Sequence, residues 1–93
     1  MSQFTVTLLE ESVDDIKLGK RFYEESEVGV DISSLRLYAG IHSTRFGYHR
    51  MLLKCFPFVV YYEKVGDEAR VIAVLDMRQN PKSIRDILKN RTN

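Results

Sequence analysis

The sequence predicts a small α+β domain in which helices pack on one face of an antiparallel sheet. Two long β-runs, residues 58–65 and 68–78, are joined at Gly66-Asp67, and an amphipathic helical pattern follows Asn80-Pro81. With 93 residues, 44% of them apolar, the chain is long enough for one packed core and too short for two domains. We therefore expect residues 1–93 to form a single domain with the element order β-α-α-β-β-β-α.

The first third of the chain predicts a strand followed by a helical hairpin. Residues 4–8 alternate between apolar and polar side chains and suit a strand. Residues 12–26 carry apolar side chains at helical spacing and predict the first helix. Gly29 is expected to end that helix, and residues 31–39 predict a short second helix.

The register of the two longest strands follows from their turn. Gly66-Asp67 suits a two-residue type II′ turn, so Val65 is expected opposite Glu68, Tyr61 opposite Ile72 and Phe58 opposite Leu75. One face should then lie beneath the helices, with Phe58, Val60, Tyr62, Val71, Ala73, Leu75 and Met77. The other face should be partly open to solvent or to a partner, with Val59, Tyr61, Glu63, Arg70, Ile72, Asp76 and Arg78.

The remaining elements flank this hairpin. Residues 48–54 predict a strand whose more apolar side chains face inward, which leaves Arg50 and Lys54 on the open face. Asn80-Pro81 is a strong helix start, because Asn is a preferred N-cap and Pro suits the first helical position. The short helix that follows has an apolar stripe and a basic surface that includes Arg85.

Charge is distributed unevenly along the chain. Residues 1–34 hold three basic and eight acidic residues, a net charge of −5, whereas residues 35–93 hold eleven basic and five acidic residues, a net charge of +6. A basic surface of this kind suits an acidic protein partner or phosphates.

Composition also limits the class of protein. The longest apolar stretch, residues 56–62, is far shorter than the ~20 residues that a spanning helix needs, so we expect no membrane segment and a cytoplasmic location. Cys55 is the only cysteine and cannot form an internal disulfide. Because no Cys or His cluster has zinc-site spacing, we expect no metal and no cofactor.

Several sequence blocks resemble one known family. The standard catalytic motifs are missing: there is no glycine-rich phosphate loop, no His-Glu-x-x-His and no serine elbow. The blocks are Asp14-Asp15-Ile16, Phe22-Tyr23-Glu24, Leu35-Arg36-Leu37-Tyr38-Ala39-Gly40-Ile41-His42, Phe46-Gly47-Tyr48-His49-Arg50, Phe56-Pro57-Phe58-Val59-Val60-Tyr61-Tyr62 and Ala73-Val74-Leu75-Asp76-Met77-Arg78-Gln79-Asn80-Pro81. In this order they resemble the RelE/ParE toxin superfamily, closest to the ParE (plasmid stabilisation) branch of bacterial type II toxin–antitoxin systems.

The resemblance implies a fold and a set of partners. The fold would be a helical hairpin on an antiparallel sheet, and the second helix would be shorter here than in relatives. The partners would be a cognate antitoxin and DNA gyrase as the inhibited target. A shortened hairpin would leave apolar surface uncovered, so we also expect a homodimer through that surface.

The expected target-binding residues are Arg50, Lys54, Tyr61, Arg78 and Arg85. Superfamily members that cleave messenger RNA use basic residues on a similar surface, so the resemblance makes Arg50, Lys54 and Arg78 weak catalytic candidates. Many of those relatives also use a C-terminal Tyr or His, and none follows Arg78 here. This difference favours a protein-binding toxin over an endoribonuclease, and we expect no direct nucleic-acid binding.

The sequence leaves two alternatives open. The chain could be a ribosome-dependent messenger RNA endonuclease, or a non-toxic remnant that still binds antitoxin or dimerises. His42 and His49 are interpreted as hydrogen-bonded structural residues rather than acid–base groups. Cys55 is interpreted as a buried apolar side chain.

Overall fold

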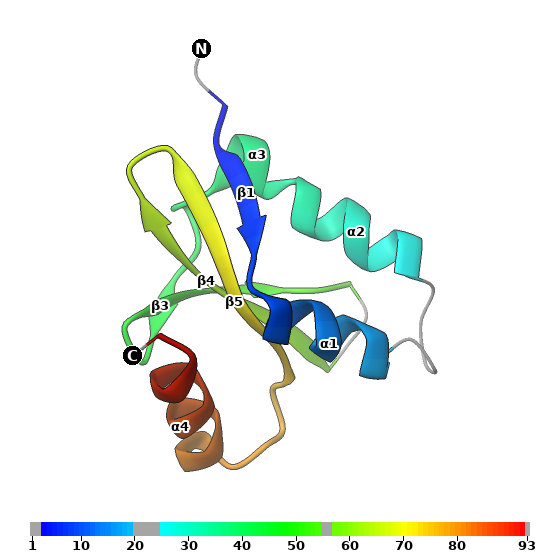
Figure 1. Cartoon of the computed structure of the whole chain (residues 1–93), viewed down its shortest axis with the longest axis vertical. Coiled ribbons are helices and arrows are strands. Elements are labelled where there is room, and N and C mark those ends of the chain that lie inside the picture. Colours follow the sequence, from blue (N-terminus) through cyan, green and yellow to red (C-terminus); the bar gives the residue numbers. More distant parts are fainter. Residues whose placement is uncertain (1–2, 20–24, 55–56, 93) are drawn as a thin grey trace.

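A computed structural model describes residues 3–19, 25–54 and 57–92 and confirms the α+β class (Figure 1). The elements are β1 (Thr5–Leu8), α1 (Glu10–Gly19), α2 (Glu25–Ser33), α3 (Leu35–Tyr38), β2 (Thr44–Arg45), β3 (Tyr48–Leu52), β4 (Phe58–Val65), β5 (Glu68–Asp76) and α4 (Pro81–Thr92). The strands form one sheet in the order β1-β5-β4-β3-β2. Because β1 runs parallel to β5 and the other pairs are antiparallel, the sheet is mixed rather than purely antiparallel.

The helical hairpin differs from the expected one at Gly29. Gly29 lies inside α2 instead of ending a helix, and it does not have a positive φ angle. A glycine with ordinary helical φ costs only about 1 kcal/mol relative to alanine. Burial of Ile32 against the sheet offsets that cost, which the local sequence does not reveal. The part of the first predicted helix at residues 20–24 lies outside the described residues.

The register of the β4–β5 hairpin is as predicted from Val65–Glu68 to Tyr62–Val71 and wrong beyond that point. A β-bulge shifts the pairing by one residue between Tyr61 and Tyr62, so Tyr61 pairs with Ala73 and Ile72 is the extra residue. The bulge moves Ala73 and Leu75 to the second face of the sheet and Val74 to the first.

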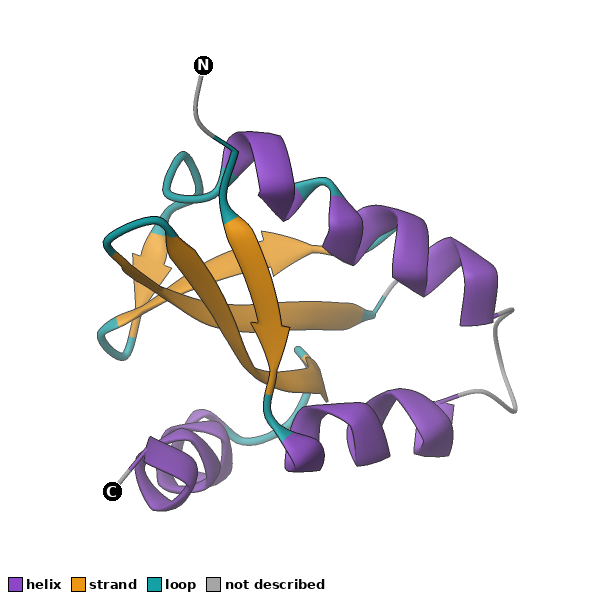
Figure 2. Ribbon diagram, turned by 45° about the horizontal axis from the view of Figure 1, so that its top comes forward, coloured by secondary structure: helices purple, strands orange, loops and turns teal. Residues whose placement is uncertain are grey.

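Each face of the sheet is covered by helices. The first face packs against the hairpin, with Ile32, Leu35 and Ala39 over residues that include Val60 and Tyr62. On the second face Ile84 and Leu88 of α4 cover Val59, Tyr61, Ile72, Ala73 and Leu75 (Figure 2). The expectation that this second face is open is therefore wrong over β4 and β5, because α4 folds back across it.

A carboxylate–guanidinium pair joins α1 to α4 at the edge of β5. Asp15 Oδ2 and Oδ1 accept hydrogen bonds from Arg91 Nη1 at 2.6 Å and Nη2 at 3.0 Å. Asp15 also accepts the Val74 N–H at 3.0 Å, and Arg91 Nη1 donates to the Ile72 carbonyl at 3.2 Å. Since β1 pairs with Glu68–Val71, the two side chains satisfy backbone groups of β5 that no strand in the described part of the chain reaches.

Candidate functional site

Strand β3 is only partly paired on the side away from β4. Strand β2 pairs with Tyr48 and His49 alone, and the Arg50 N–H then donates to the Ser43 carbonyl at 2.9 Å. The Leu53 N–H points to β4, where it donates to the Phe58 carbonyl at 3.0 Å. Because backbone groups alternate in direction along a strand, the N–H and C=O of Leu52 point away from β4. We call residues 50–54 the β3 edge, although strand β3 itself ends at Leu52.

The far end of this edge is closed by a side chain from α2. Asp31 Oδ2 accepts the Lys54 N–H at 3.1 Å. The unpaired stretch is therefore short and has a defined limit at each end, Ser43 at one and Asp31 at the other.

The side chains of this region alternate as the sequence predicts. Met51 and Leu53 are buried in the core between the first face of the sheet and the helical hairpin, whereas Leu52 is 59% exposed and Lys54 is exposed. Arg50 is half-buried on the same face as Leu52. An open pocket of about 340 Å³ lies here, lined by His42, Ser43, Arg50, Met51 and Leu52.

Tyr61 is not part of an open surface. The side chain is 1% exposed and packs in the cluster formed with α4, so its expected place on a binding surface is wrong. It is the cross-strand partner of Arg50. Burial raises the pKa of the Tyr61 hydroxyl, and the positive charges of Arg50 and Arg45 partly counter that rise.

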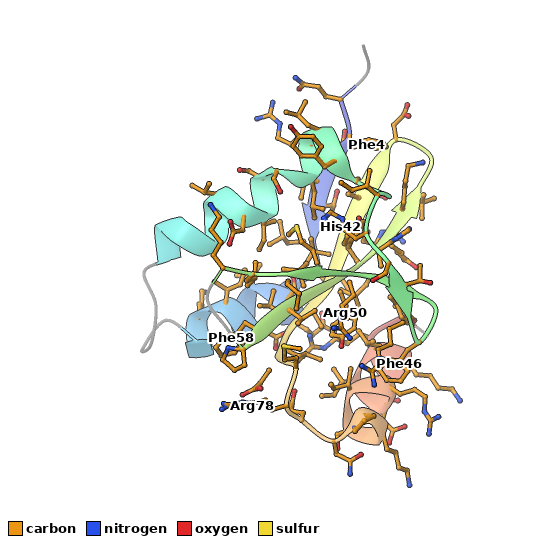
Figure 3. All side chains as sticks on the ribbon, turned by 180° about the vertical axis from the view of Figure 1, so that it is seen from behind. Phe4, His42, Phe46, Arg50, Phe58 and Arg78 are labelled. Carbon is orange, nitrogen blue, oxygen red and sulfur yellow. The ribbon has the colours of Figure 1, made fainter. Side chains whose placement is uncertain are left out.

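The other predicted site residues are spread over the molecule. Arg78 is exposed and is held by Asp76, with Nε to Oδ1 at 3.1 Å and Nη2 to Oδ2 at 2.9 Å. These hydrogen bonds lower the pKa of the Asp76 carboxyl. Figure 3 shows Arg78 well apart from Arg50, and Arg85 lies exposed on α4. The structure therefore brings Arg50 close to Tyr61 but does not gather the predicted cluster.

Sequence reasoning missed a hydrogen-bonded cluster of two histidines and a tyrosine. The hydroxyl of the buried Tyr62 accepts the Gly40 N–H at 2.8 Å and lies 2.6 Å from His42 Nδ1. His49 Nδ1 lies 2.8 Å from the His42 carbonyl and must be the donor there, since a carbonyl only accepts. The His49 ring stacks on Tyr62 with centroids 5.0 Å apart. No sequence spacing signals this cluster, because its members come from a loop and two strands.

Burial, the neighbouring His49 and the Tyr62 hydroxyl all favour the neutral form of His42. A buried hydroxyl needs an acceptor for its hydrogen, and neutral His42 with its hydrogen on Nε2 offers Nδ1. Burial lowers the pKa of His42 below its ordinary value, and the neighbouring His49 lowers it further. The two histidines thus have structural contacts, as the sequence interpretation proposed.

This arrangement predicts that stability falls on mild acidification. The pKa of His42 is lower in the folded chain than its ordinary 6.5, so the unfolded chain binds more protons as the pH drops through 6.5. We expect the free energy of unfolding from urea titrations to be lower at about pH 5.5 than at about pH 7.5. His42→Gln removes the titrating group and should reduce this pH dependence. An equal dependence in both proteins would contradict the assignment.

A second candidate surface is an apolar groove between the helical hairpin and β1, which we call the hairpin groove. It has a volume of about 390 Å³ and is lined by Val6, Leu8, Val13, Ile16, Gly29, Ile32, Ser33 and Arg36. Strand β1 is an edge strand of the sheet, and α1 and α2 extend beyond its free edge (Figures 1 and 2). The groove therefore lies open between the two helices.

The described ranges contain neither a metal-binding cluster nor a membrane-spanning helix. Within residues 3–19, 25–54 and 57–92, no group of three His, Cys, Asp or Glu side chains could hold a metal ion. In the same part of the chain, no helix is both long and apolar enough to cross a membrane. Cys55 lies outside the described residues, so its expected burial stays a prediction.

Comparison with protein-family models, curated proteins and solved structures finds no match.

Proposed function

We propose that this protein is a ParE-like toxin of a type II toxin–antitoxin system, acting in the cytoplasm by binding and inhibiting DNA gyrase and neutralised by a cognate antitoxin. The observation that carries the proposal is the hairpin groove. Open apolar surface on a small domain is typical of a site for another protein chain. Because the sequence blocks resemble those of ParE-like toxins, the proposed occupant of the groove is the cognate antitoxin.

The contacts of the polar side chains favour a binding protein over an enzyme. His42 Nδ1 is engaged by the buried Tyr62 hydroxyl, so that atom is not free to take a proton from a substrate. Arg78, one of the three weak catalytic candidates, is held by Asp76 and lies away from Arg50. Protein binding needs neither group as an acid or base.

The test is inhibition of purified DNA gyrase by the purified full-length chain. We expect loss of supercoiling of a relaxed plasmid and growth arrest when the chain is expressed in a bacterium. Leu8→Glu, in the groove, should weaken neutralisation by the antitoxin encoded beside the gene, whereas Thr7→Glu, on the opposite face of β1, should not. Normal supercoiling together with normal growth would refute the proposal and favour the non-toxic remnant.

The endoribonuclease remains a second candidate because one pocket contains an imidazole and a guanidinium. His42 and Arg50 both line the pocket on the β3 edge, and such groups can bind and cleave a phosphodiester. Cleavage of messenger RNA in a translation extract, lost in Arg50→Ala, would favour this candidate. Intact messenger RNA would exclude it.

A further inference from the structure

Among the described residues, no strand pairs with the β3 edge on the side away from β4 beyond the Ser43 contact, and the edge has a defined beginning and end. From the Ser43 contact at Arg50 to the Asp31 contact at Lys54, the chain advances four residues, which corresponds to about 13 Å of extended strand. Within it the Leu52 N–H and C=O point outward beside the 340 Å³ pocket. An extended segment placed there would continue along β3 from the point where β2 ends.

The side chains along this edge follow a basic–apolar–basic pattern. Arg50 and Leu52 lie on one face of β3, and the next alternate position is Lys54, which is exposed two residues beyond the end of the strand. In the described part of the chain, neither Arg50 nor Lys54 forms a salt bridge through its side chain. The edge thus presents two cations with an exposed leucine between them.

The same charges argue against a second copy of this chain at the β3 edge. In an antiparallel pair related by a two-fold axis at Leu52, Arg50 would face Lys54 of the partner copy. Like charges directly opposite each other on paired strands are destabilising, and basic residues on edge strands discourage self-association.

We propose that the β3 edge binds an extended segment of another protein with acidic, apolar and acidic residues at alternate positions. The segment would exchange backbone hydrogen bonds with Leu52, place its apolar side chain beside the Leu52 side chain, and set its two carboxylates against Arg50 and Lys54. This inference does not depend on the toxin proposal, since it concerns a surface separate from the hairpin groove.

The test uses the full-length protein and two synthetic peptides blocked at both ends. One peptide contains Glu-Thr-Leu-Thr-Glu between glycines and the other contains Lys-Thr-Leu-Thr-Lys. NMR amide shifts should change at residues 50–54 with the acidic peptide only, and exchange of the Leu52 amide hydrogen should slow at least about tenfold in the complex. Shifts centred on the hairpin groove, or equal binding of both peptides, would overturn the proposal.

Two variants separate backbone pairing from charge attraction. Leu52→Pro removes the outward N–H without removing a bond to β4 and should weaken binding at least about tenfold, whereas Leu52→Ala keeps the N–H and should weaken it about threefold. Lys54→Glu, at an exposed position, leaves one cation and one anion along the edge, so the preference for the acidic over the basic peptide should be lost even if the proline variant folds poorly. Unchanged peptide preference in Lys54→Glu would overturn the proposal.

Competition with RNA shows whether the edge prefers peptide carboxylates or phosphates. A short single-stranded RNA should not compete with the acidic peptide at physiological salt, because a phosphate chain cannot pair with the Leu52 backbone. RNA binding that exceeds peptide binding and survives in Leu52→Pro would overturn the proposal and identify a phosphate-binding surface.

Discussion

Arg91→Met is expected to lower the free energy of unfolding by about 3 kcal/mol, because it leaves the Asp15 carboxylate without its charged partner. The side chains of Arg91 and Asp15 are only 17% and 11% exposed, so water replaces the lost contacts poorly. The hydrogen bond from Arg91 to the Ile72 carbonyl is lost as well. Urea unfolding monitored by circular dichroism measures the change.

Arg85→Met provides the matched control for this prediction. Arg85 lies on the same helix and is exposed, so its replacement should change stability by about 0.5 kcal/mol or less. In the double variant Asp15→Asn/Arg91→Met, the loss of unfolding free energy should be smaller than the sum of the losses in the two single variants, since both changes break the same pair. A loss below about 1 kcal/mol in Arg91→Met would show that the pair behaves like a solvent-exposed salt bridge.

Tyr61→Ala should destabilise the fold by about 3–5 kcal/mol, the range for truncating a buried aromatic side chain. Tyr61 is 1% exposed and packs with residues such as Ile84 and Leu88 of α4, so its loss leaves a cavity beneath that helix. A residue on an open binding surface would cost little stability when truncated. Thermal and urea unfolding therefore decide between the core position seen in the structure and the binding position expected from the sequence.

Tyr38→Ala tests the same chemical change at an exposed position. The Tyr38 side chain is 54% exposed, so we expect a change within about 0.5 kcal/mol. Similar large losses in both variants would point to a general effect of removing tyrosine and would contradict the burial argument for Tyr61.

The sequence predicts much of the fold through local signals. Alternation along residues 48–54 correctly places Met51 and Leu53 inward. Gly66, with a φ of 58°, makes the turn that sets the start of the β4–β5 register. Asn80-Pro81 correctly predicts the start of α4, where the Asn80 side chain accepts the Lys82 N–H at 2.8 Å. Each of these signals acts over only a few residues.

The errors arise where distant residues decide the outcome. No pattern within β5 signals the bulge at Ile72, and none reveals Asp15 and Arg91, which satisfy the nearby backbone groups that β1 does not reach. The wrong prediction of an open second face has a similar origin. The sequence identifies α4 but does not show on which face of the sheet the helix packs. Tyr61 therefore seemed open for binding, although Arg50 beside it was correctly placed near an accessible surface.

The link between Asp15 and Arg91 also affects how the chain reaches its fold. The two residues are 76 positions apart, and β1 pairs with a strand about 60 positions later through partners such as Thr5 and Glu68. Long-range closures of this kind slow folding, because loop entropy is lost before the contacts form. During synthesis, α1 and β1 leave the ribosome long before their partners exist. The pair that ties α1, one wall of the hairpin groove, to the rest of the fold can therefore form only after the last turn of α4 has been made.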